Sequence, residues 1–174
     1  MNSEGGSRPE MLKENKELLA ETAEKMGHDF ERTYHGCSQA TLAAVMRTLG
    51  IKDEGVFRAA FPFAGGFGLK QGICGGIAGG AMALGLASDK YGRSWSEHSK
   101  WDMDTILESM YRTRKYLDRV QKELGTLSCR EITKADFSTR AGIDKYIESP
   151  EFETCCVNCG KVARIVVEML LEED

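Results

Sequence analysis

Six cysteines are the residues of this 174-residue sequence that are best suited to chemistry. Three stand alone, Cys37, Cys74 and Cys129, and three fall in the run Cys155-Cys156-Val157-Asn158-Cys159. A cysteine thiolate can act as a nucleophile, a disulfide partner or a metal ligand. Within the run, Cys156 and Cys159 have the CxxC spacing, at which two sulfur atoms can reach each other or one metal ion. The cysteines therefore indicate redox or metal-binding chemistry.

The composition and net charge limit the cellular location and the partners that we expect for this protein. The segment Met1–Glu10 is polar and glycine-rich and lacks the apolar core of a secretory signal, so we expect a cytoplasmic protein with reduced thiols. A net charge of -4 argues against nucleic acid and anionic membrane surfaces as partners. The uncharged run Gln71–Ser88 is rich in glycine, which favours a buried helix over a membrane span.

Apolar residues recur at helical spacing along most of the chain, and no alternating strand pattern stands out. We predict an all-α fold: a single-domain helical bundle over 10–174, preceded by a disordered leader at 1–9. The helices are expected at Glu10–Tyr34, Ser38–Leu49, Ile73–Ala87, Ser96–Leu124, Ala141–Ile147 and Cys159–Leu171.

Glycine is concentrated around Cys74. Breakers in Phe61–Gly72 predict a loop with positive φ angles, and the glycines of Ile73–Ala87 predict a central helix whose small face lets other helices approach closely. Cys37 and Cys74 then fall beside helix starts, and Asn158 could cap a helix that begins at Cys159. We expect the helix dipole to lower the pKa of thiols at such positions.

Four cysteine segments together resemble the C_GCAxxG_C_C family of redox-active proteins. The segments are Tyr34–Ala40, Gly65–Gly68 with Gly72–Gly85, Ser128–Ile132 and Cys159–Ala163. Gly76 stands where the pattern leads us to expect alanine, and Cys155 and Cys156 are additional to its four cysteines. The resemblance covers the chain from Tyr34 onward and implies a redox or electron-transfer role.

Our leading hypothesis is that Cys37, Cys74, Cys129 and Cys159 converge at helix ends and either exchange disulfides or hold an iron–sulfur cluster. The ligands of a metal would come from these four cysteines and Cys156. Backbone N–H groups of the glycine-rich turn, at Gly72 and Gly75, would tune a bound cluster. The electron donor and acceptor, a redox partner protein among them, are not specified by the sequence.

Two alternatives belong to other functional classes. The first is a non-catalytic helical module stabilised by zinc, with a homodimer formed through the apolar seam of Ser96–Leu124. The second is a cysteine-nucleophile enzyme in which His35 serves as the base for Cys37. Covalent c-type haem is not expected, because Gly160 and not histidine follows Cys159.

Overall fold

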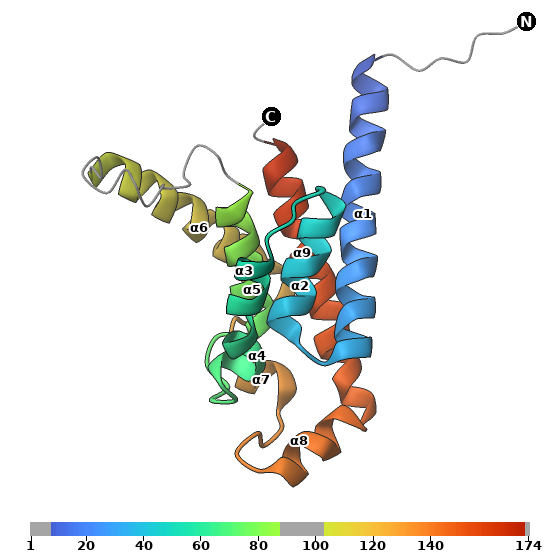
Figure 1. Ribbon diagram of the computed structural model, residues 1–174, viewed down its shortest axis with the longest axis vertical. Coiled ribbons are helices and arrows are strands. Elements are labelled where there is room, and N and C mark those ends of the chain that lie inside the picture. The colour runs from blue at the N-terminus through green and yellow to red at the C-terminus, as the bar shows by residue number, and fades with distance from the viewer. Residues whose placement is uncertain (1–7, 88–102, 173–174) are drawn as a thin grey trace, which may run out of the picture.

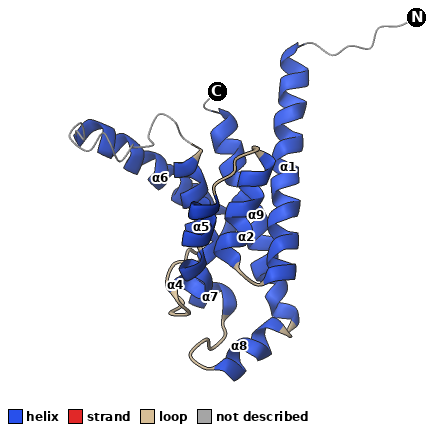
Figure 2. Cartoon of the chain, viewed as in Figure 1, coloured by secondary structure: helices blue, strands red, loops and turns tan. Residues whose placement is uncertain are grey.

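The computed structural model describes residues 8–87 and 103–172, and the chain is helical through most of these ranges (Figures 1 and 2). No strand occurs in the described ranges, so the predicted all-α class is confirmed. The α-helices are α1 (Arg8–Tyr34), α2 (Cys37–Thr48), α3 (Glu54–Ala59), α4 (Ala64–Phe67), α5 (Gly75–Leu86), α6 (Met103–Leu124), α7 (Cys129–Thr133), α8 (Arg140–Ile147) and α9 (Glu153–Glu172). Two short 3-10 helices, η1 (Phe61–Phe63) and η3 (Pro150–Phe152), precede α4 and α9.

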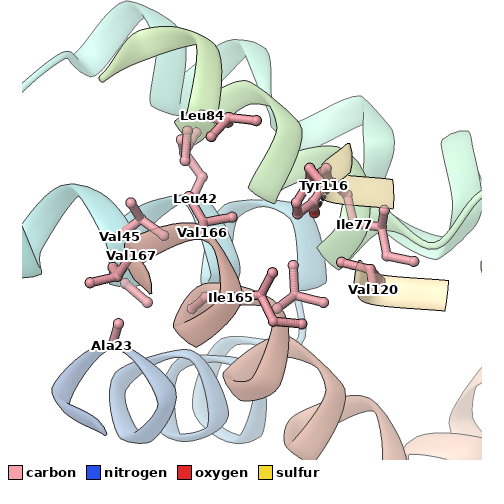
Figure 3. Close-up of a cluster of buried hydrophobic side chains, with 14 of the residues drawn as sticks. Ala23, Leu42, Val45, Ile77, Leu84, Tyr116, Val120, Ile165, Val166 and Val167 are labelled. Atoms are coloured by element: carbon pink, nitrogen blue, oxygen red, sulfur yellow. Dashed lines mark hydrogen bonds between the residues drawn. The ribbon is translucent and has the colours of Figure 1, made fainter. Parts of the chain in front are cut away.

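The core lies where α1, α2, α5 and α9 pack against one another, with α6 against α5 and α9. Apolar side chains of all these helices meet there (Figure 3), among them Ala23, Leu42, Val45, Ile77, Leu84, Tyr116, Val120, Val166 and Val167. Burial of such side chains is the main favourable term in folding. The core therefore fixes how the ends of these helices are placed relative to one another.

Glycines on facing helices permit the close contact between α1 and α9. A methyl group on Gly27 would lie 2.7 Å from the carbonyl oxygen of Cys159, and one on Gly160 would lie 2.5 Å from that of Glu24. Helix backbones in such close contact leave no room for a Cβ atom. The close contact of α1 with α9 thus fixes the position of Cys159 along α1.

Glycines of α5 likewise allow neighbouring helices to approach closely. A methyl group on Gly79 would collide with the carbonyl oxygen of Ser38 in α2, and one on Gly80 would collide with the phenol of Tyr116 in α6. The Tyr116 hydroxyl donates a 2.8 Å hydrogen bond to the carbonyl oxygen of Ile77. Glycine's cost in helix stability is thus offset by packing on two sides.

Several predicted boundaries were wrong. The final helix begins at Glu153 and not at Cys159, so Asn158 lies inside α9 and does not cap it. Helix α3 was not predicted, although the Asp53 side chain accepts from the N–H of Val56 as its cap. Helix α7 was also missed, and it is capped by Ser128. The expected loop at 61–72 contains η1 and α4.

Parts of other predictions lie outside the described residues. This applies to 1–7 of the predicted leader and to 96–102 of the long helix predicted from Ser96. Where the structure describes them, α1 begins at Arg8 and α6 at Met103. None of the helices described is long and apolar enough to cross a bilayer.

Candidate thiol site

Cys37 and Cys74 lie at helix starts, as predicted. Cys37 is the first residue of α2 and Cys74 is the N-cap residue of α5, and both side chains are buried. The backbone N–H groups of Gly76 and Ile77 lower the pKa of the Cys74 thiol, and that of Gly65 lowers the pKa of the Cys37 thiol, although burial outweighs both effects. Backbone amides thus favour the thiolate form of both cysteines.

Two glycines of α5 allow three thiols to gather. The point that a methyl group on Gly76 would occupy lies 3.1 Å from the sulfur of Cys159 and 3.7 Å from that of Cys74. The corresponding point on Gly75 lies 2.5 Å from the sulfur of Cys37. The thiol of Cys159 also donates a 3.7 Å hydrogen bond to the carbonyl oxygen of Cys37. We refer to Cys37, Cys74 and Cys159 as the inner thiols.

A short stretch of backbone pairing places Cys129 at the edge of the inner thiols. The N–H of Cys74 donates to the carbonyl of Leu127 at 2.9 Å, and the N–H of Cys129 donates to that of Gly72 at 2.7 Å. An isolated antiparallel bridge joins the residues between them. The Cβ atom of Cys129 lies 2.7 Å from the point that a methyl group on Gly66 would occupy, so this position also needs glycine.

The run 155–159 divides between two environments because it lies on a helix. Cys156 is fully buried in a separate cluster with Tyr146 and Phe152. Cys155 contacts the Tyr146 hydroxyl at 3.2 Å, and its charge raises the pKa of Cys37 while that of Cys74 raises its own. Of the CxxC pair, Cys159 therefore belongs to the inner thiols, whereas Cys156 belongs to the neighbouring apolar cluster.

Burial governs the ionisation of these thiols. All six cysteines are free, and desolvation is the largest influence on each. It raises the pKa of Cys129 to about 12 and moves the pKa values of Cys37 and Cys159 well above 9. The expected lowering of the pKa at helix starts was wrong: desolvation of the thiolate outweighs the backbone N–H groups at Cys74. Cys159 is not at a helix start at all.

The family comparison matches this arrangement of segments. The model of the family described as "Putative redox-active protein (C_GCAxxG_C_C)" matches residues 34–170. The chain belongs to this family. The resemblance predicted from Tyr34 onward is confirmed, and the family description supports a redox role in general terms. No curated protein and no solved structure matched the chain.

Glu31 of this C_GCAxxG_C_C protein was missed by the sequence analysis and lies outside the matched segment. Its side chain is 4% exposed, and the backbone N–H of Gly36 lowers its pKa by less than burial raises it. Among the described residues Oε2 has no hydrogen-bond partner, and burial raises the Glu31 pKa to about 8. One signal was available, since Glu31 follows Ala23 and Gly27 at steps of four along the buried stripe of α1.

The other residues predicted to belong to the site are engaged in packing or in backbone hydrogen bonds. The imidazole of His35 is exposed and packs edge-on to Phe152 at 5.1 Å, whereas Cys37 is buried, which gives no support to His35 as its base. Gly72 donates its N–H to the carbonyl of Gly66 at 3.0 Å, so that N–H is already committed. Gly75 makes room for the sulfur of Cys37.

The described side chains do not form a metal-binding group. Within residues 8–87 and 103–172, no group of three or more Cys, His, Asp or Glu side chains is arranged to hold a metal ion. Four thiolates are the usual ligands of iron–sulfur clusters and of structural zinc. The thiols as placed in the described residues do not form such a ligand set.

Proposed function

We propose that this protein is a thiol–disulfide redox protein whose reacting groups are the inner thiols Cys37, Cys74 and Cys159. The observation that carries the proposal is the approach of two sulfur atoms, those of Cys74 and Cys159, to one point beside Gly76, at 3.7 and 3.1 Å. Disulfide formation requires two cysteines whose side chains converge in this way. Cys129 and Cys155, at the margin of the same group, are candidate resolving thiols.

The reaction would be an exchange with the disulfide of a redox partner protein or of a small thiol compound. One inner thiol loses its proton and attacks a sulfur atom of that disulfide, which gives a mixed disulfide and releases one thiol. A second inner thiol then attacks the mixed disulfide and releases the other. Two protein thiols are oxidised to one disulfide, and the incoming disulfide is reduced to two thiols. We expect this cycle in the cytoplasm, where thiols are kept reduced.

The iron–sulfur, electron-transfer and zinc hypotheses rest on the cysteine pattern of the sequence. Support for them would come from metal analysis, because a protein-bound cluster or zinc ion is present in stoichiometric amount and its loss lowers stability. The exchange proposal needs only the thiols that the fold brings together.

Helix α6 supports the further proposal of a homodimer. Its N-terminal half extends away from the other helices (Figure 1), and Met103, Met110 and Tyr111 are exposed on it. Large apolar side chains that recur at helical spacing on an exposed face are typical of helix–helix interfaces.

A glutathione titration tests the redox proposal. Protein purified without oxygen is equilibrated at graded glutathione potentials, and its free thiols and bound metals are counted. We expect two thiols to disappear in one two-electron step, out of six in wild type and out of five in Cys156→Ser. Thiols that stay free and unreactive across the range would contradict the proposal, as would stoichiometric iron or zinc on the inner thiols.

A further inference from the structure

We propose that Glu31 is the proton-exchanging residue of the thiol site: it accepts the proton of an attacking inner thiol and returns it to the leaving sulfur. The inference rests on the proposed function. It assigns a role to a residue of α1, a helix that contains no cysteine. Folding alone does not explain why a carboxyl group is buried at this position.

The position of Glu31 follows from the crossing of α1 and α9. Gly27, one turn earlier on α1, lies directly against the backbone of Cys159. Glu31 continues the same face. At its other side, the backbone N–H of Gly36, the residue before Cys37, favours the carboxylate form of Glu31. Glu31 is therefore held between the segments that carry two of the inner thiols.

Among the described residues, the charge of Glu31 acts on thiols and is not offset by a cation paired with it. A charge on Glu31 raises the pKa of all six cysteines, on α2, α5, α7 and α9, and that of the Tyr146 phenol on α8. No basic group contributes to the pKa of Glu31 itself. Nearby Arg32 and His28 instead pair with Glu153.

Burying a carboxyl group without a full set of partners costs several kcal/mol in general. Groups of this kind cluster at functional sites. Here the Oε2 atom is buried and has no hydrogen-bond partner in the described part of the chain. A buried thiol needs a base, because its own thiolate is strongly disfavoured, and a carboxyl group with a pKa of about 8 is far better matched to a thiol than an ordinary glutamate.

The proton balance closes over the two exchange steps. In each, the Glu31 carboxylate takes the S–H proton while the sulfur attacks the incoming disulfide or the mixed disulfide. The S–S bond under attack breaks, and the departing sulfur leaves with the proton from the Glu31 carboxylic acid. After both steps, two protein thiols have become a disulfide, two thiols have been released and Glu31 is in its starting state.

The test is the rate of disulfide formation with oxidised glutathione, measured from about pH 6 to about pH 10. For wild type we expect the rate to rise and then level off above a pH of about 8, where Glu31 is ionised. Glu31→Gln keeps the shape of the side chain but cannot exchange a proton. We expect it to be about 100-fold slower or more at that pH and to keep rising to the end of the range.

Two further variants separate proton exchange from a structural effect. Glu31→Asp keeps a carboxylate and should restore part of the rate and the levelling of the profile. Glu21→Gln changes an exposed glutamate on the same helix and should behave as wild type. If Glu31→Gln does not fold, the wild-type profile decides alone: a rate that climbs steadily to the top of the range contradicts the inference.

The outcomes also separate the inference from the proposed function. Identical profiles for wild type and Glu31→Gln, both forming the disulfide, would overturn the role of Glu31 and leave the redox proposal standing. Failure of wild type to form any disulfide would overturn both.

Discussion

The thiol of Cys159 donates a hydrogen bond to the carbonyl oxygen of Cys37 across a sequence separation of 122 residues. The contact joins the second turn of α9 to the first residue of α2. It exists because α1 packs along α9 through Gly27 and Gly160 and then turns directly into α2. The thiol site is thus a product of helix packing, and its predicted behaviour can be tested through the residues that permit that packing.

Gly75→Ala should destabilise the protein by about 1–3 kcal/mol, because the added methyl group would lie 2.5 Å from both the sulfur of Cys37 and the carbonyl oxygen of Phe63. Chemical denaturation measures the loss. Gly85→Ala on the same helix is the matched control: nothing lies within 4 Å of its added methyl group, so it should stabilise by up to about 1 kcal/mol. Equal effects of the two substitutions would contradict the packing described at Cys37.

Gln71→Ala should loosen the segment that carries Cys129. The buried Gln71 amide donates to the Thr133 hydroxyl at 3.0 Å and to the Ala135 carbonyl at 2.8 Å, and its oxygen accepts from the N–H of Phe137 at 3.3 Å. Leaving such partners unpaired costs about 1–3 kcal/mol each. We expect lower stability and faster alkylation of Cys129 in the native state, measured by mass spectrometry. Unchanged alkylation would mean that Gln71 does not hold Cys129 in place.

Glu31 should make the protein less stable as the pH rises. In the folded state its pKa is raised from 4.5 to about 8, so it stays protonated where the unfolded chain has already lost the proton. Its contribution is full below pH 4.5 and is lost as the pH rises through about 8. The loss is on the order of 5 kcal/mol.

Denaturation under reducing conditions at several pH values in this window measures the effect as the difference between wild type and Glu31→Gln. The variant should lack this pH dependence and be the more stable protein at the alkaline end, while Glu21→Gln should follow wild type. A difference between wild type and Glu31→Gln that does not change with pH would show that Glu31 ionises normally in the folded state.

The proposed homodimer should depend on the exposed apolar face of α6. Met110 is 55% exposed, so Met110→Lys should leave the fold intact and convert a dimer to a monomer in sedimentation equilibrium. Gln121→Lys, at another exposed position of α6, should stay dimeric. A wild-type protein that sediments as a monomer would remove the basis of this proposal.

The sequence allowed the long helices to be predicted because their apolar residues repeat at helical spacing, and α1, α2, α5, α6 and α9 all exist. The start of α9 was predicted six residues too late, because three closely spaced cysteines suggest a loop-to-helix junction, whereas they occupy the first two turns of the helix. Short helices such as α3 and α7 carry too few residues for a periodic signal.

The cysteines of the candidate site could be named from the sequence as a hypothesis, whereas their surroundings could not be predicted. The four cysteines of the family pattern were named, but periodicity cannot show which of Cys156 and Cys159 faces the others, since that depends on the rotation of α9 against α1. Burial raises the thiol pKa values by more than a helix dipole lowers them. Burial in turn depends on how the whole chain packs. Glu31 was overlooked as one glutamate among several on α1, although it follows Gly27 on the buried stripe.

Disulfide mapping is the most direct test of the claim that the inner thiols form a redox centre. The protein is oxidised with glutathione, the remaining thiols are blocked, and the linked peptides are identified by mass spectrometry. We predict a disulfide between two of Cys37, Cys74 and Cys159, with Cys156 recovered as a free thiol. A disulfide that includes Cys156, or no disulfide among the inner thiols, would contradict the account.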